Sequence, residues 1–319
     1  MRPMEIGNGR SERVVSTRNI GEAEAGKTLD FLVIGAQKAG TTTLFKHMQG
    51  HPELHLPPEK EAPFFTRDDR WERGWRWYEQ EFLPDVPEGV RIGKVTPHYL
   101  ADPRAPRRIR QMFPRVKLIA ILREPCERAL SHYRMSLRRG IETRGPDEAL
   151  RAALEDAEAG DLGTDKEGEA RCYIAWSEYG RLLEGFRKHF PTEQLQVLFL
   201  DDLRDDPGDL LGHTFDFLGV DAGYEPPTLG KKYYVGGTRN RITVLERFDS
   251  LPGLRFLWKM IPERKRRVIN FWMEHLNVVP SLEEEAMPSE ETMDLLRAHF
   301  RKDLARLTDL LGHPPPWDL

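Results

Sequence analysis

Short apolar runs alternate with longer amphipathic segments along most of this 319-residue chain. Continuous apolar runs are typical of strands buried on both faces of a parallel sheet, and the segments between them are long enough to form crossover helices. The runs that predict strands are Phe31–Ile34, Val90–Val95, Val116–Leu122 and Leu195–Leu200. The alternation predicts an α/β fold with three layers, α/β/α, around a mostly parallel central sheet.

Periodicity and stop signals predict the helices between and after these strands. The expected helices are Thr41–Gln49, Trp71–Phe82, a segment ending near Phe113, Cys126–Arg139, part of 147–170, Arg171–Phe190, Leu210–Leu218 closed by Gly219, and 283–311. The proline-rich stretch 51–69 is expected to be an extended loop, because proline does not fit a helix interior, and Asp201–Leu203 a turn. Trp317 is predicted to anchor the chain end in the core.

We expect one domain from residue 28 to residue 319. It is preceded by a polar segment, 1–27, which lacks an apolar signal core and is predicted to be flexible. Residues 242–280 carry aromatic and apolar positions at helical spacing, which predicts a C-terminal helical cap. No internal repeat divides the chain.

The first predicted strand leads into a turn and a helix start that together form an anion site. Gly35 to Gly40 form the turn, and the free amides and positive dipole end of the following helix point at it. Lys38 adds a charge, the backbone amides of Ala39 and Gly40 add donors, and hydroxyls come from Thr41, Thr42 and Thr43. The lysine precedes the second glycine, so this is not a Walker A loop. We predict a P-loop-like phosphate site.

Two further positions are expected to face the same crevice. Arg123 follows the strand Val116–Leu122, and ligands of open α/β sheets bind beyond the carboxyl ends of the strands. Ser131 lies two helical turns later and could bind the same anion. The basic, glycine-containing stretch 231–241, with Gly237, Thr238 and Arg239, is either a loop that closes over a nucleotide or a plain connection.

Composition excludes several classes of protein. The net charge is −4 and the pI about 6.2, so no global basic field favours nucleic acid. The two cysteines, Cys126 and Cys172, give neither a disulfide framework nor a zinc spacing. We expect them to be free thiols in a reducing compartment, and no apolar run is long enough to span a membrane. A cytoplasmic protein without nucleic-acid partners is therefore predicted.

An ordered set of motifs resembles the sulfotransferases that use 3′-phosphoadenosine 5′-phosphosulfate (PAPS), on the branch of the heparan-sulfate N- and O-sulfotransferases. The set comprises Gly35–Thr43, Lys60-Glu61 with Phe64-Phe65, Thr96–Tyr99, Arg123–Pro125 with Arg128 and Ser131–Tyr133, and the ending Leu311–Trp317. The resemblance covers most of the chain from about Leu29 onward. It implies a donor substrate, PAPS, a product, adenosine 3′,5′-bisphosphate, and no metal.

The resemblance also implies residue roles. Lys38 and the amides of Ala39 to Thr42 would hold the 5′-phosphosulfate, and Arg123 with Ser131 the 3′-phosphate. Glu61 would be the general base of an in-line sulfuryl transfer. His98 could contact the acceptor or act as an alternative base, or it could be a plain turn histidine. The late loop at 236–239 would close on the 3′-phosphate and adenine.

This sequence departs from that branch at three places. A lysine that often stands directly before the Thr-Pro turn is replaced by Val95, and Lys94 comes one residue earlier. One step along a strand turns a side chain to the other face, which makes Lys94 a poor candidate for catalysis. Pro63 stands where histidine is frequent, and the late loop has no cysteine pair.

Several readings stay open from the sequence. Glu61 could instead be a surface carboxylate that pairs with Lys60 or an arginine. The chain could be an ATP-dependent phosphotransferase, or a nucleotide-binding protein without catalysis. The acceptor of a sulfuryl group, whether a glycan, a glycolipid, a lipid alcohol or another small molecule, is not determined by these residues.

Overall fold

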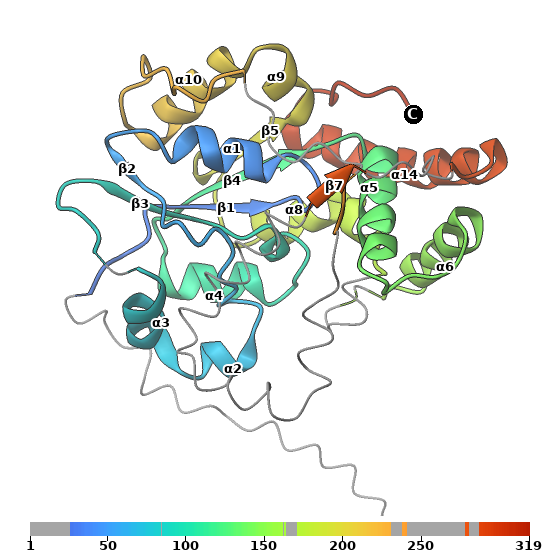
Figure 1. Ribbon diagram of the computed structural model, residues 1–319, viewed down its shortest axis with the longest axis horizontal. Helices are drawn as coiled ribbons and strands as arrows, with labels where there is room; N and C mark the ends of the chain where they lie inside the picture. The colour runs from blue at the N-terminus through green and yellow to red at the C-terminus, as the bar shows by residue number, and fades with distance from the viewer. Residues whose placement is uncertain are drawn as a thin grey trace, which may run out of the picture.

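The structure is a computed structural model, and it describes residues 26–83, 85–161, 163, 171–230, 238–240, 278–280 and 287–319. Its centre is a five-stranded sheet in the order β2-β3-β1-β4-β5, in which all neighbours pair in parallel (Figure 1). The strands are β1 Phe31–Gly35, β2 Leu54–His55, β3 Arg91–Val95, β4 Lys117–Leu122 and β5 Leu195–Phe199. The predicted parallel sheet is confirmed, and Leu54–His55 adds a short edge strand inside a stretch expected to be loop.

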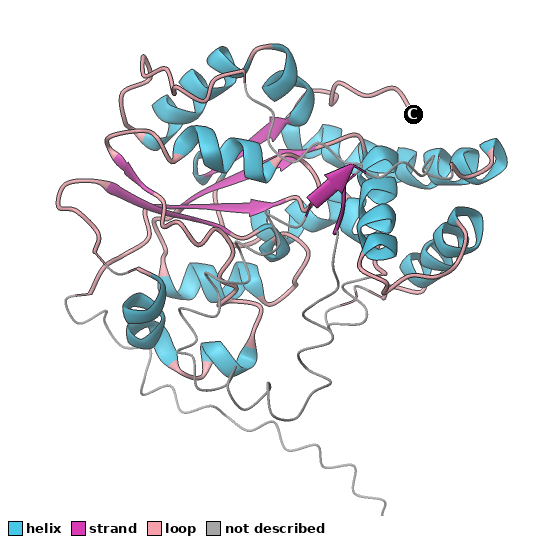
Figure 2. Ribbon diagram, viewed as in Figure 1, coloured by secondary structure: helices cyan, strands magenta, loops and turns pink. Residues whose placement is uncertain are grey.

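Helices cover both faces of this sheet (Figure 2). They are α1 Thr41–Met48, α2 Asp68–Trp71, α3 Gly74–Phe82, α4 Ala105–Met112, α5 Pro125–Arg138, α6 Pro146–Glu158, α8 Tyr179–Arg187, α9 Leu200–Asp205, α10 Pro207–Leu218 and α14 Glu290–Leu311. Single turns of 3₁₀-helix lie at η2 Pro97–Tyr99, η3 Ala175–Ser177 and η4 Thr192–Gln194. Helices on both sides of a parallel sheet make the predicted three layers.

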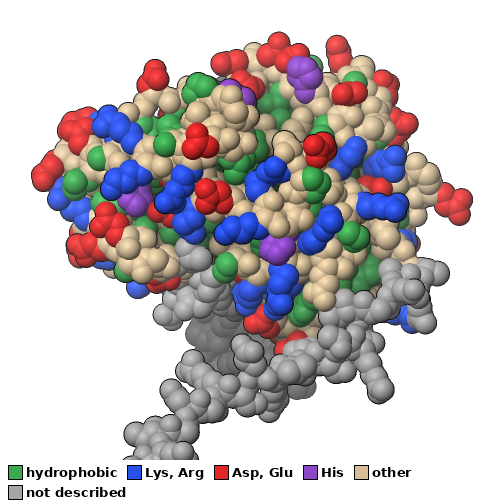
Figure 3. Space-filling model, turned by 180° about the vertical axis from the view of Figure 1, so that it is seen from behind, with side chains coloured by type: hydrophobic (Ala, Val, Ile, Leu, Met, Phe, Trp, Pro, Cys, Tyr) green, Lys and Arg blue, Asp and Glu red, His purple; other side chains and the backbone are tan. Residues whose placement is uncertain are grey.

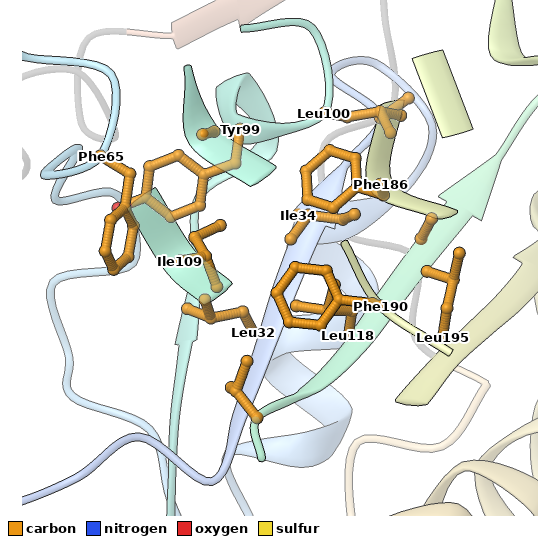
Figure 4. Packing of buried hydrophobic residues seen from close by; sticks show 14 of the residues in the cluster. Leu32, Ile34, Phe65, Tyr99, Leu100, Ile109, Leu118, Phe186, Phe190 and Leu195 are labelled. Atoms are coloured by element: carbon orange, nitrogen blue, oxygen red, sulfur yellow. The ribbon is translucent and has the colours of Figure 1, made fainter. Parts of the chain in front are cut away.

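Alternate residues of β1 face two separate cores. Leu32 and Ile34 pack with side chains of α4 and α8, a cluster shown in Figure 4. Phe31 and Val33 point the other way and pack with α1 and α10. A strand that is buried on both faces has apolar residues at every position, which explains the unbroken run Phe31–Ile34.

The expected helix Arg171–Phe190 was wrong in its first half. Residues 171–177 form a turn and η3, and α8 begins at Tyr179. The carboxylate of Asp303 on α14 fixes this start, because it accepts the backbone N–H groups of Gly180 at 2.8 Å and Arg181 at 2.9 Å. A residue more than a hundred positions away therefore sets the helix boundary.

Two other local predictions were also wrong. Asp201–Leu203 is helix α9 instead of a turn, because Leu200 and Leu203, three residues apart, both bury against the sheet. The single helix expected over Trp71–Phe82 is divided into α2 and α3 at Gly74, which has a φ of 79°. Left-handed backbone ends one helix before the next begins.

The last part of the predicted helical cap is strand. Val278–Pro280 forms β7 and pairs antiparallel with β6, Thr238–Asn240. The rest of the cap, 242–277, lies outside the described residues, as do residues 1–25 of the predicted N-terminal segment.

Lys27, the last residue of the predicted N-terminal segment, donates from its backbone N–H to Glu79 of α3. Helix α14 begins at Glu290, seven residues later than expected. Within the described ranges, no helix has the length and apolar character needed to cross a bilayer.

Candidate active site

The predicted phosphate loop lies between β1 and α1 at the carboxyl edge of the sheet. Gly40 is the N-cap of α1 with a φ of 89°, and a Cβ at this position would lie 2.6 Å from Leu200 Cδ1. Both the backbone angle and the space therefore require glycine. Glycine has no side chain to cap the helix, and the first turn of α1 contains no acidic residue. The amides at the start of α1 are thus suited to an external anion.

Lys38 sits in this loop with a φ of 70°, in the left-handed region that side chains rarely adopt. Burial, together with the charges of Arg138, Arg139, Arg123 and Arg128, lowers the pKa of Lys38 to about 8. At pH 7 the ammonium is still mostly protonated. These five cationic side chains repel one another. A multiply charged anion bound among them would offset this repulsion.

Arg123 follows β4, the strand next to β1, and reaches the same loop. Its Nη1 lies 3.5 Å from the carbonyl oxygen of Lys38, and its Nη2 pairs with Glu127 at 2.9 Å. The structure therefore brings Arg123 and Lys38 to one edge of the sheet, as predicted for two groups that share one nucleotide. Ser131 lies on α5 and is half-buried. Gly237 is outside the described residues, and Thr238 and Arg239 belong to β6.

Glu61 is tied to the phosphate loop through its neighbour. Lys60 Nζ lies 2.9 Å from Glu61 Oε1 and 3.2 Å from Thr41 Oγ1, the hydroxyl of the first residue of α1. Thr41 itself is buried, while Thr42 and Thr43 are half-buried on the same turn. The ion pair with Lys60 was one of the open readings of Glu61, and here it places the carboxylate beside the anion site.

The electrostatics keep Glu61 ionised. Desolvation raises the pKa of Glu61, but the charge of Lys60, followed by that of His98, outweighs it and holds the pKa below its ordinary value. At neutral pH the side chain is a carboxylate, which is the form that accepts a proton.

His98, on η2, lies on the far side of Glu61 from Lys60. Its Nε2 is 3.1 Å from Gln37 Nε2, and its Nδ1 is 3.9 Å from Glu61 Oε2. If the Gln37 amide donates, the histidine proton resides on Nδ1 and faces the carboxylate. The Trp176 ring lies 5.8 Å from the imidazole. Gln37 thereby links the phosphate loop to the histidine and the candidate base.

Lys94 takes the other face of β3 from Val95, as its offset in the sequence predicted. Its side chain is buried, its Nζ donates to the carbonyl of Glu59 at 2.9 Å, and it lies 5.8 Å from the Phe82 ring. Val95 packs in the core on the α1 side. The structure thus gives Lys94 contacts with the backbone of the segment that carries Glu61.

Sequence reasoning missed the contribution of Arg128, which is fully buried beneath the phosphate loop. Its guanidinium donates to Ser177 Oγ and the Tyr173 carbonyl, both at 2.5 Å, and to the Gln37 carbonyl at 3.4 Å. Burial lowers the pKa of Arg128 to about 10, so it stays charged. The signal was an arginine among the apolar positions Cys126, Ala129 and Leu130 of a helix face.

Charges of both signs share the surface seen in Figure 3, in which several Lys and Arg side chains gather around a histidine near the middle of the face. In the part of the chain that the structure describes, no group of three or more His, Cys, Asp or Glu is arranged to hold a metal ion. The basic groups named above carry the charge that would neutralise an anion at this loop.

The parallel sheet and the lysine-bearing loop at its carboxyl edge define a P-loop-like fold whose loop geometry suits a phosphorylated ligand. The family model described as "Sulfotransferase domain" matches residues 28–233. The chain therefore belongs to the sulfotransferase family, as its motifs predicted.

Two relatives that align with this chain carry heparan sulfate in their names. The chain is 30% identical over 196 residues to human heparan sulfate glucosamine 3-O-sulfotransferase 3B1, a match that covers 59% of this chain and 45% of the relative. It is 31% identical over 202 residues to human bifunctional heparan sulfate N-deacetylase/N-sulfotransferase 3, covering 60% and 22%. The match thus spans less than half the length of either relative.

A solved structure agrees with the fold over nearly the whole chain. The sulfotransferase from Alicyclobacillus acidocaldarius aligns with a TM-score of 0.64 and 21% identity, covering 91% of this chain and 98% of that one. This likeness supports the arrangement of sheet and helices described above.

Proposed function

We propose that this chain is a PAPS-dependent sulfotransferase, and that residues 28–319 form its single domain. It would move a sulfuryl group from PAPS to a hydroxyl or amine of a glycan, glycolipid or small-molecule acceptor. The observation that carries the proposal is the meeting of three groups at the start of α1: Lys38, Arg123 beside the Lys38 carbonyl, and Glu61 linked to Thr41 through Lys60. Family membership supports the same reaction.

In this proposal each residue has one task. The amides of Ala39 to Thr42 and the hydroxyls of Thr41, Thr42 and Thr43 orient the 5′-phosphosulfate. Lys38 neutralises charge on the bridging oxygen of the leaving bisphosphate. Arg123 and Ser131 bind the 3′-phosphate, with Gly237, Thr238 and Arg239 closing over it. Glu61 takes the acceptor proton, and His98 orients Glu61 or the acceptor.

The acceptor is proposed to carry its hydroxyl or amine on a sugar. One observation supports this: the relatives named above act, by their names, on heparan sulfate. Transfer of labelled sulfuryl to a panel of glycans, glycosides and lipid alcohols tests the acceptor class.

Cys126 and Cys172 are both buried and form no disulfide with each other, in keeping with the predicted reducing, cytoplasmic environment. This location is part of the proposal. The protein can be produced in an oxidising compartment and its thiols titrated. If both cysteines still titrate as thiols there, their state no longer supports a reducing environment.

Binding and turnover test the donor and the base separately. Calorimetry should find that the protein binds adenosine 3′,5′-bisphosphate in preference to ATP, and that Arg123→Ala weakens this binding at least about tenfold. Glu61→Gln should keep bisphosphate affinity within about twofold while lowering turnover about 10²–10⁴-fold. Preference for ATP would contradict the proposal, and loss of nucleotide binding in Glu61→Gln would make Glu61 structural.

A further inference from the structure

Lys60 is the side chain that joins the candidate base to the anion site. With 13% of its side chain exposed, Lys60 contacts both Glu61 Oε1 and Thr41 Oγ1 through its Nζ. The hydroxyl of Thr41 belongs to the turn whose amides point at the anion. One cation therefore lies within hydrogen-bond distance of the base on one side and of the donor position on the other.

We propose that Lys60 is a donor-responsive switch, which holds Glu61 in this structure and moves to the sulfuryl oxygens when PAPS binds. This inference rests on the proposed function. The geometry supports it because the move is short: Nζ already lies 3.2 Å from the Thr41 hydroxyl, so rotation of a flexible side chain brings it to an anion held at the start of α1.

Release of Lys60 changes what Glu61 can do. The charged groups that face Glu61 are Lys60 on its own segment, His98 on η2 and Arg139 at the end of α5. Lys60 is the largest of the favourable charges, so its departure raises the pKa of the carboxylate and makes it a stronger base. Glu61 would then be strongest as a base only when the donor is bound.

The reaction balances with these two residues. Glu61 accepts the proton of the acceptor hydroxyl as the acceptor oxygen forms its bond to sulfur. The bond between sulfur and the 5′-phosphate oxygen breaks, and its electron pair leaves with adenosine 3′,5′-bisphosphate. Lys60 neutralises the sulfuryl oxygens throughout, while Lys38 neutralises the leaving oxygen.

A contact between Lys60 and the sulfuryl group predicts that replacing Lys60 changes the affinities for two nucleotides by different factors. Adenosine 3′,5′-bisphosphate lacks the sulfuryl group, so Lys60→Met should leave its affinity within about twofold and weaken PAPS binding about tenfold. Lys60→Arg keeps the charge and should restore most of the PAPS affinity. Calorimetry without acceptor measures both constants. Because the Lys60–Glu61 pair is partly exposed, the melting temperature should change little.

Lys46 provides a matched control, because it lies on α1, the helix whose first residue Lys60 contacts, and bonds instead to Gln49 Oε1 at 3.4 Å. Lys46→Met should change neither affinity. Equal loss of both nucleotides in Lys60→Met would assign Lys60 to loop structure, and no loss of either would make it a surface pair; both results overturn the switch. Failure of the unaltered protein to bind either nucleotide would instead overturn the proposed function.

Discussion

At the scale of single residues, the most deeply buried positive charge of the site is that of Arg128. Its hydrogen-bond partners include a hydroxyl, backbone carbonyls and a ring nitrogen, the Nδ1 of His132. A buried charge of this kind is costly unless something offsets it. Its position under the Gln37 carbonyl would let an anion at the loop supply the offset.

Replacement of Arg128 tests this interpretation. Arg128→Lys keeps a cation but loses the planar guanidinium that donates to Ser177 and Tyr173 at the same time. The phosphate loop should then be held less firmly, and bisphosphate should bind about tenfold more weakly. Calorimetry measures the affinity, and a thermal melt reports whether the variant is folded. A folded variant with unaltered affinity would show that Arg128 supports only the core.

At the scale of elements, two helices start at the same edge of the sheet but differ in their caps. The side chain of Glu124 accepts hydrogen bonds from the backbone N–H groups of Cys126 at 2.9 Å and Glu127 at 2.5 Å. The first turn of α5 therefore has its free N–H groups capped by a residue of the chain. Helix α1, whose N-cap is Gly40, has no such side-chain cap. The first N–H groups of α1 are therefore better suited to an external anion than those of α5.

A carboxylate after α5 holds the next segment in place. Glu142 is buried, receives two hydrogen bonds from the Arg144 side chain at 3.0 and 2.8 Å, and accepts the Tyr173 hydroxyl at 3.1 Å. The Tyr173 carbonyl in turn accepts a hydrogen bond from the Arg128 guanidinium. The loop after α5 and the segment around Tyr173 thus form one hydrogen-bonded unit beneath the site.

This unit should make stability depend on pH. Desolvation raises the pKa of Glu142, but its hydrogen bonds, chiefly from Arg144, outweigh this and lower the pKa to about 2. A lowered pKa stabilises the fold above the unfolded value of about 4.5, and the contribution is lost as pH falls toward 2. Glu142→Gln should therefore reduce the unfolding free energy by about 2–3 kcal/mol at pH 7 and by much less near pH 3. Urea titrations at both pH values test this, and a pH-independent difference would contradict it.

At the scale of the whole molecule, the end of the chain supports the sheet edge that carries the site. Trp317 is buried, donates from Nε1 to Asp201 Oδ2 at 2.8 Å, and lies 5.3 Å from the Phe199 ring. Its ring also lies 6.1 Å from Tyr179, whose hydroxyl donates to the Arg123 carbonyl at 2.9 Å. The predicted anchor role of Trp317 is confirmed, and its contacts lead to the backbone of Arg123.

Loss of this anchor should lower the stability of the whole fold. Trp317→Ala removes a large buried side chain and its hydrogen bond, and we expect the free energy of unfolding to fall by about 3 kcal/mol. His313→Ala changes an exposed residue of the same tail and should alter it by less than about 0.5 kcal/mol. Denaturant titration of both variants measures the difference, and equal effects would mean that Trp317 contributes no core packing.

The sequence by itself determined the parallel sheet and the phosphate loop, because both depend on local patterns. Strands buried on two faces need unbroken apolar runs, and the turn before α1 needs Gly40 for its positive φ. It also placed Lys38 and Arg123 at the same edge, since parallel strands end together.

Only the tertiary structure decided which distant groups meet. The start of α8 depends on Asp303, the burial of Arg128 depends on the segment around Tyr173, and Lys60 reaches Thr41 from a loop. Such contacts join residues that no local periodicity relates, because side-chain hydrogen bonds are formed by the packing of elements and leave no regular spacing in the sequence.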